Sequence, residues 1–298
     1  MTATAVTARG ARFEPQLMRR KLNGTLFYGA CLLAIGLTLL ALLLLLVDVF
    51  TRGLPFLDPD FLTGVPSRRA ERAGILPALA GSVWMGILVG AMTFPAGVAA
   101  AIYLAEYAGG GWLSRFLRTN IANLAGVPSI IYGIFGLALF VRGLGLGPTL
   151  LAGSLTLSLL ILPVVILVSI EAIKAVPDSQ REAAYALGAT RWQMVRRAVL
   201  PAAAPGILTG IILAMARSIG ETAPLILIGA VTFVTYLPNP TEGGYTVLPI
   251  QIFSWAGRFQ PQFQAIAATG IVVMLAVLFA LNALALIVRA RLSRHLQW

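Results

Sequence analysis

The sequence predicts an all-α, polytopic membrane protein with about six transmembrane helices. Of its 298 residues, 58% are hydrophobic and only 11% are charged, whereas soluble domains carry about a quarter charged residues. The mean hydropathy is +0.88. Apolar runs of about 20 residues, the length that crosses a hydrocarbon core, recur along the chain. These observations indicate that membrane spans take up most of its length.

The apolar runs define the expected spans in order. They are Thr25–Phe50, Leu76–Tyr103, Ile121–Val141, Thr149–Ile170, Ile207–Tyr236 and Phe263–Val288. The third run is interrupted by glycines and by Pro128, which membrane helices tolerate when neighbours satisfy the freed backbone groups. No linker separates the runs. We therefore expect one transmembrane domain over residues 25–298, after an N-terminal arm over residues 1–24.

The basic residues predict the orientation. With the N-terminus in the cytoplasm, most arginines and lysines fall in the cytoplasmic loops and termini, which is the usual bias of membrane proteins. The cluster Arg68–Arg72 on the outer side is a mild exception, although acidic residues lie nearby. We predict that both termini are cytoplasmic.

Composition also limits the chemistry. The net charge of +11 could suit nucleic acid, but the basic residues are spread over several loops, as membrane topology requires. We therefore expect the chain to contact membrane lipid and not to bind nucleic acid. The single cysteine, Cys31, and the single histidine, His295, cannot form a Cys/His metal cluster. We expect no catalytic residue, metal or cofactor in this chain.

Aromatic residues gather in the outer loop Leu237–Gln262, where Phe253, Trp255 and Phe259 lie. They fit an interfacial aromatic belt. A contact for an external partner is the alternative.

A polar, basic segment lies between the fourth and fifth expected spans. Ser179 followed by Glu182 fits a capping box, so we expect a helix to begin at Ser179. Thr190 followed by Gln193 fits a second capping box, for a short helix that ends at Pro201. Apolar side chains in this segment need cover from the membrane surface, from the chain's own spans or from a partner.

A resemblance to a known family rests on six residues: Glu182, Ala183, Ala184, Gly188, Leu200 and Pro201. Their spacing is similar to the EAA loop of ABC importer permeases, E-A-A-x₃-G-x₉-I-x-L-P. One departure is Ala198, where the family pattern has Ile. The resemblance implies that residues 171–204 form a coupling loop seated in a groove of an ATPase subunit, with Glu182 facing polar groups there.

The chain itself lacks the G-x-x-x-x-G-K-[ST] phosphate-binding loop of nucleotide-hydrolysing proteins. ATP and Mg are therefore expected on a separate ATPase subunit.

The fifth expected span contains two charged residues, Arg217 and Glu221. They are four residues apart and so can pair on one helix face. Each costs roughly 2.5–3.5 kcal/mol at the centre of a membrane helix, so both should face protein or water. The same face carries Gly206 and Gly210, a spacing suited to close helix packing. The pair either fixes helix packing or marks a substrate route, where the arginine would suit an anion such as phosphate.

Further segments resemble the phosphate-specific transport permeases PstA and PstC. Ala216–Leu225 is similar to the A-R-x-x-G-E-T-A-P-L run of PstA, Gly126–Gly133 to a G-x-P-S-I-x-x-G segment of both, and Leu248–Trp255 to the outer loop of PstA. The resemblance runs from about Ile75 to the C-terminus. It implies a type I ABC importer permease, with a substrate pathway or gate that includes Arg217, Ser218, Glu221 and Thr222.

The same resemblance implies partners and a location. The chain would pair with a PstC-like permease, sit on a PstB-like ATPase dimer and receive phosphate from a PstS-like binding protein at the bacterial inner membrane. Two alternatives remain: a type I permease for phosphonate, molybdate or sulfate, and a channel or carrier that needs no ATPase.

Overall fold

The computed structural model describes residues 17–230, 233–241 and 243–294. Within these residues the regular structure is helical and contains no β-strand, which confirms the all-α prediction. The chain divides into two units, residues 1–48 and 49–298. The first unit is described from Leu17, so most of the predicted N-terminal arm and His295 lie outside the described residues.

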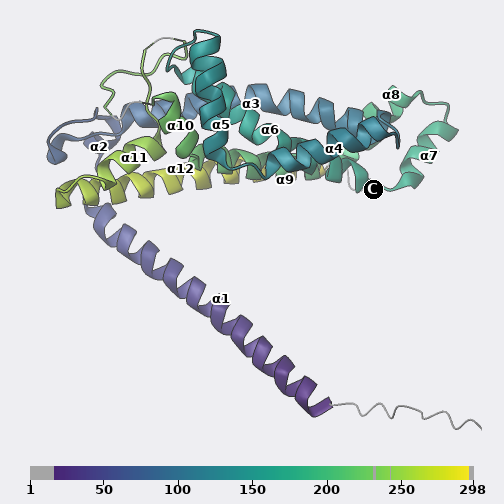
Figure 1. Cartoon of the computed structure of the whole chain (residues 1–298), viewed down its shortest axis with the longest axis horizontal. Coiled ribbons are helices and arrows are strands. Elements are labelled where there is room, and N and C mark those ends of the chain that lie inside the picture. The colour runs from purple at the N-terminus through teal and green to yellow at the C-terminus, as the bar shows by residue number, and fades with distance from the viewer. Residues whose placement is uncertain (1–16, 231–232, 242, 295–298) are drawn as a thin grey trace, which may run out of the picture. The chain divides into compact units, whose positions relative to one another are not determined.

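The helices follow one another along the chain (Figure 1). They are α1 (Leu17–Gly53), α2 (Pro59–Thr63), α3 (Leu76–Ile102), α4 (Trp112–Ala125), α5 (Ser129–Gly136), α6 (Leu150–Lys174), α7 (Asp178–Ala186), α8 (Arg191–Met194), α9 (Leu200–Gly220), α10 (Ala223–Ile228), α11 (Leu248–Ala256) and α12 (Pro261–Arg294). Short 3₁₀ segments lie at η1 (Leu54–Phe56) and η2 (Ala70–Arg72), and π-helical segments at η3 (Tyr103–Tyr107), η4 (Leu137–Gly143) and η5 (Val195–Val199).

Five helical stretches in the described residues are long and apolar enough to cross a membrane, and a bent pair makes up to six. The bent pair is α4 with α5 and η4, whose axes differ by 99°. Pro128 has no N–H and sits just before α5, and the hydroxyl of Tyr132 donates to the Leu124 carbonyl at the end of α4. The third expected span is therefore present, broken where its glycines and proline predicted an interruption, and it starts earlier, at Trp112.

The predicted fifth span, Ile207–Tyr236, is wrong in its bounds. The helix begins at Arg191, runs through η5 and α9, and ends at Gly220. Pro201 does not stop it, because it lies in the first turn of α9 directly after a π-helical turn, which is wider than an α-turn. Beyond Gly220 the backbone extends at Glu221 before α10 begins.

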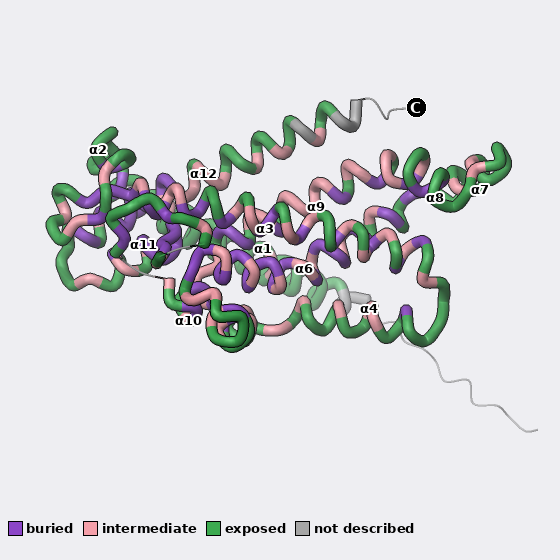
Figure 2. The backbone as a smooth tube through the Cα atoms, turned by 90° about the horizontal axis from the view of Figure 1, so that it is seen from above, coloured by how far each residue is buried: buried purple, intermediate pink, exposed green. Residues whose placement is uncertain are grey.

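In the second unit, α3, α6, α9 and α12 run side by side, and α5 stands across them (Figure 1). Buried residues concentrate where these helices meet (Figure 2). Glycines permit the contact: a Cβ at Gly97 of α3 would lie 2.7 Å from Val165 Cγ1 of α6, and one at Gly210 of α9 would overlap Val168. Gly206 likewise faces Ala172, so the predicted close packing of this glycine pair is confirmed.

The two ends of the second unit differ. One end holds α2 and α11, and the other holds α7 and α8 (Figures 1 and 2). At the first end Trp255 is fully buried beside Phe61, with ring centroids 5.9 Å apart. Trp255 is therefore a core residue and not part of an aromatic belt, whereas Phe253 and Phe259 are exposed.

Candidate coupling loop and transport path

The first helix of the coupling loop, α7, begins one residue before the expected position. Pro177 occupies the N-cap and no side chain caps the helix, so the predicted capping box at Ser179 and Glu182 is wrong. Pro177 already supplies extended backbone, with φ −59° and ψ 142°. Asp178 then stands in the first turn, where an acidic side chain interacts favourably with the helix dipole.

The turn and the second helix form as expected. Gly188 has a φ of +78°, a conformation that costs little only for glycine. The hydroxyl of Thr190 accepts from the Gln193 backbone N–H, and the Gln193 side chain accepts from the Thr190 N–H. This capping box starts α8.

The loop presents apolar side chains away from the bundle. Leu187 is 90% exposed, and Tyr185 and Trp192 are about half exposed. A mixed polar and apolar hollow of about 680 Å³ lies within the loop, lined by residues that include Ala183, Ala184, Gly188 and Pro201. Leu200 instead packs inward, against the cluster formed by the ends of α3 and α6. Glu182 is exposed on α7.

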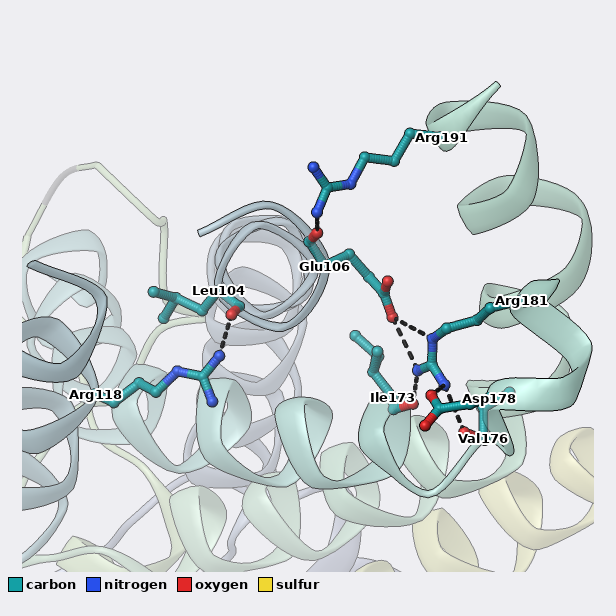
Figure 3. Close-up of polar contacts among 8 residues, drawn as sticks. All are labelled: Leu104, Glu106, Arg118, Ile173, Val176, Asp178, Arg181 and Arg191. Carbon is teal, nitrogen blue, oxygen red and sulfur yellow. Dashed lines mark hydrogen bonds and ion pairs between the residues drawn. The ribbon is translucent and has the colours of Figure 1, made fainter. Parts of the chain in front are cut away.

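Three arginines fasten this end of the second unit together (Figure 3). Arg181 of α7 forms an ion pair with Glu106 of η3, with 2.9 Å between Nη2 and Oε1. Arg191 of α8 donates to the Glu106 carbonyl and lies over the Tyr107 ring, and Arg118 of α4 donates to the Leu104 carbonyl. The carbonyls at a helix end lack intrahelical partners, so the end of α3 is a natural acceptor for these side chains.

Sequence reasoning did not single out the ion pair between Glu106 and Arg181. The available signal was a lone carboxylate, Glu106, at the end of an apolar run. The network brings Arg118, Arg181 and Arg191 to one end, so the two loops that the charge bias predicted on the same side of the membrane do lie at the same end.

The second candidate site lies at the break between α9 and α10. Arg217 Nε is 3.4 Å from Glu221 Oε1. Glu221 lies beyond the last helical residue, in extended backbone, so the pair spans the break rather than one helix face. The Arg217 side chain is 53% exposed and that of Glu221 is 17% exposed. An arginine so placed keeps donors available for an anion.

The other two predicted pathway residues differ in position. Ser218 is buried in the packed side of α9, and Thr222 is half-buried in the break. The hydroxyl of Thr222 lies 3.5 Å from the Gly220 carbonyl. The paired Arg217 and Glu221, with Thr222 next to Glu221 in the chain, are the polar group at the break, whereas Ser218 faces the core.

Residues 94–296 match the model of the family described as "Binding-protein-dependent transport system inner membrane component". The chain belongs to this family. The matched region includes the coupling loop and the α9–α10 break. The chain is thus a multi-pass membrane permease with the fold of type I ABC importer permeases.

Individual relatives agree with the family. The chain is 38% identical over 63% of its length to "Probable ABC transporter permease protein YqgH" of Bacillus subtilis, and the aligned region spans 64% of that protein. It is 37% identical over 81% of its length to "Phosphate transport system permease protein PstA 1" of Mycobacterium tuberculosis, covering 80% of it.

A solved structure shares the fold. It is a bacterial ABC transporter involved in the import of the acidic polysaccharide alginate, with a TM-score of 0.64 and 17% sequence identity. The match covers 93% of this chain and 99% of that one.

Proposed function

We propose that this chain is the permease subunit of an ATP-driven importer of inorganic phosphate. The observation that supports phosphate as the substrate is the similarity of this chain to a protein named as a phosphate transport permease, with 37% identity over 81% of the length of this chain. The Arg217–Glu221 pair at the α9–α10 break is chemically suited to that anion, because a guanidinium matches the geometry of phosphate oxygens.

The energy would enter at the coupling loop. Leu187 and Trp192 protrude from it, and an ATPase subunit would cover these side chains and hold α7 in a groove. ATP and Mg would be bound by a dimer of that PstB-like subunit. Closure of the dimer would move α7. The helices on either side of the loop, α6 and α9, would tilt as α7 moves. Transport would then proceed by alternating access.

The polar group at the break would act on the substrate route. Glu221 Oε1 lies 3.4 Å from Arg217 Nε. An arriving phosphate would compete with the carboxylate for the guanidinium, and the exposed side of Arg217 would be its first contact. Neither residue forms or breaks covalent bonds in this process.

The two ends of the second unit would face different partners. The end with α7 and α8 would face the cytoplasm. The bias of basic residues supports cytoplasmic termini as well, in a protein of a bacterial inner membrane. The end with α2 and α11 would face a PstS-like phosphate-binding protein. A PstC-like permease would complete the pathway.

The test is anion uptake in a bacterial strain that lacks its own phosphate permease. The chain, expressed with its ATPase, second permease and binding protein, should restore uptake of labelled phosphate. An excess of unlabelled sulfate, molybdate or phosphonate should not compete. Competition by one of these anions would mean that this anion is the substrate. Phosphate uptake that persists without the ATPase would contradict the proposal that ATP drives transport.

The coupling role is tested separately in the same strain. Replacing Glu182 by Ala should lower phosphate uptake while the chain still reaches the membrane. Gln180→Ala is a matched control on the same exposed helix. Wild-type uptake by Glu182→Ala would remove Glu182 from the coupling contact.

A further inference from the structure

We propose that Glu106 and Arg181 form a joint that transmits motion of the coupling helix α7 to both α3 and α6. Neither residue is an expected docking or pathway residue, and the two are 75 positions apart in the chain. The proposal rests on the proposed function, because it presumes that an ATPase moves α7. It assigns both side chains as positioning residues for that movement.

The ion pair is shielded from water. The Glu106 side chain is 8% exposed and that of Arg181 is 16% exposed. By contrast, Asp178, which also pairs with Arg181 at 3.0 Å, is 88% exposed, and the pair between Glu171 and Lys174 of α6 is largely exposed. Exposed pairs contribute little, whereas removing one partner of a buried pair leaves an uncompensated charge. Glu106 and Arg181 are therefore expected to stay together as the loop moves.

Arg181 joins three elements at once. Its Nε and Nη2 lie 3.2 and 2.9 Å from Glu106 Oε1 at the end of α3. Nη2 also donates to the Ile173 carbonyl of α6, and Nη1 donates to the Val176 carbonyl just beyond α6. A planar guanidinium can serve all these acceptors from one position, which a lysine ammonium cannot do with the same geometry.

The joint has a second fixing point on α8. Arg191 donates to the backbone carbonyl of Glu106 and lies 4.8 Å from the Tyr107 ring centroid. Both helices of the coupling loop are thus tied to η3 (Figure 3). A force on the loop would be applied to α3 through η3 as well as along the chain to α6 and α9.

The first experiment measures coupling in the complete complex in proteoliposomes. Glu106→Gln and Arg181→Met should assemble with the ATPase and hydrolyse ATP, but phosphate uptake per ATP should fall about tenfold, a usual size for the coupling between two sites. Arg115→Met, which removes an exposed arginine of α4 outside the coupling loop, is the matched control and should keep the wild-type ratio. A wild-type ratio in both joint variants would overturn the proposal.

If Arg181→Met does not assemble with the ATPase, a second variant, Arg181→Lys, tests the same proposal. Arg181→Lys keeps a positive charge beside Glu106 but cannot reach the same acceptors together. Its uptake per ATP should be lowered about fivefold, at the low end of measured coupling factors, and an unchanged ratio would also overturn the proposal.

The second experiment does not depend on phosphate. Spin labels at Ser179 of α7 and Tyr103 of η3, both exposed, are introduced in a Cys31→Ser background. In the wild type their distance should be the same with and without a trapped nucleotide, because α7 and η3 move together. In Glu106→Gln the distance should change or broaden on trapping. An equal change in wild type and variant would refute the joint, whereas failure of phosphate uptake alone would refute only the substrate.

Discussion

Gly133 of α5 lies directly against Pro224 of α10, so close that a Cβ on the glycine would be 2.7 Å from Pro224 Cα. Each residue belongs to a short helix that follows a break in a longer one: α5 comes after the bend at Pro128, and α10 after the extended residue Glu221. The contact therefore places the two interrupted segments of the chain against each other. One of these segments carries the Arg217–Glu221 pair, so the packing of α5 helps to position the polar group.

Replacing Gly133 by Ala should disturb this contact. The added methyl group meets backbone on one side and the Leu227 side chain on the other, and overpacking of this kind costs about 1–3 kcal/mol. We expect a lower melting temperature of the purified chain and lower phosphate uptake. Gly110→Ala is the control, because its Cβ would meet no atom within 4 Å. Equal melting temperatures for the two variants would show that α5 can shift to accommodate the methyl group without a loss of stability.

Arg217→Ala should lower phosphate uptake. Hydrogen bonds to charged groups contribute about 1.5–3 kcal/mol, which corresponds to a factor of about ten to one hundred in the apparent affinity or rate. Arg217→Lys should recover part of the loss, because it retains the charge but not the fork of donors. Arg142→Ala, which removes another exposed arginine, should transport normally. Wild-type uptake by Arg217→Ala would take this residue off the substrate route.

Some features of the site follow from local sequence and others do not. Gly188 and the Thr190 capping box were predictable because a left-handed turn and a helix start depend on neighbouring residues only. The Glu106–Arg181 pair was not, since tertiary packing alone joins residues so far apart in the chain. Ser179 shows the limit even for local signals, because Pro177 had already set the extended backbone from which α7 begins.

The fold shows the same division. Hydropathy and length predicted the spans, and Pro128 predicted an interruption, but the 99° bend depends on packing of α5 against α10. The apolar run beyond Gly220 did not continue α9, although its hydropathy favoured a span. Composition cannot distinguish an interfacial aromatic residue from a buried one, so the sequence alone predicts an interfacial position for Trp255, which is in fact buried beside Phe61.

Gly188→Ala should weaken the coupling loop. Its φ of +78° costs a residue with a side chain roughly 1–2 kcal/mol, so α7 and α8 would be held less well in their relative orientation. We expect less ATPase subunit to copurify with this variant. Gly188→Asn should bind more ATPase than Gly188→Ala, because asparagine tolerates the left-handed conformation. The reverse order would contradict a backbone origin for the effect.

Leu187→Asp should reduce copurification of the ATPase subunit, because Leu187 is almost fully exposed at the tip of the loop and a charge there would lose its apolar contact with the partner. Phe259→Asp makes the same kind of change at the opposite end, where Phe259 is also exposed, and should leave ATPase binding unchanged. If both variants bind the ATPase as the wild type does, the partner does not dock on this part of the loop.

Tyr245 offers a test of stability against pH. Its side chain is buried beside Gly153, and its hydroxyl makes no hydrogen bond with the described residues. An unpaired buried hydroxyl costs about 1–3 kcal/mol, so Tyr245→Phe should raise the melting temperature at neutral pH. A clear fall would indicate a hydrogen bond that the hydroxyl makes in the assembled protein.

The sign of the pH effect follows from burial, which raises the pKa of Tyr245 above its ordinary value of 10.0. The folded state therefore keeps the phenol neutral where the unfolded state begins to lose its proton. Well below pH 10 the phenol is neutral in both states, so its titration does not change the free energy of unfolding. Above pH 10 the free energy of unfolding of the wild type falls progressively until the pH reaches the pKa of the folded state. Because phenylalanine has no proton to lose, the melting temperature of Tyr245→Phe should exceed that of the wild type by a margin that grows from pH 9 to pH 11. A constant margin over that range would mean that water reaches the phenol in the folded state.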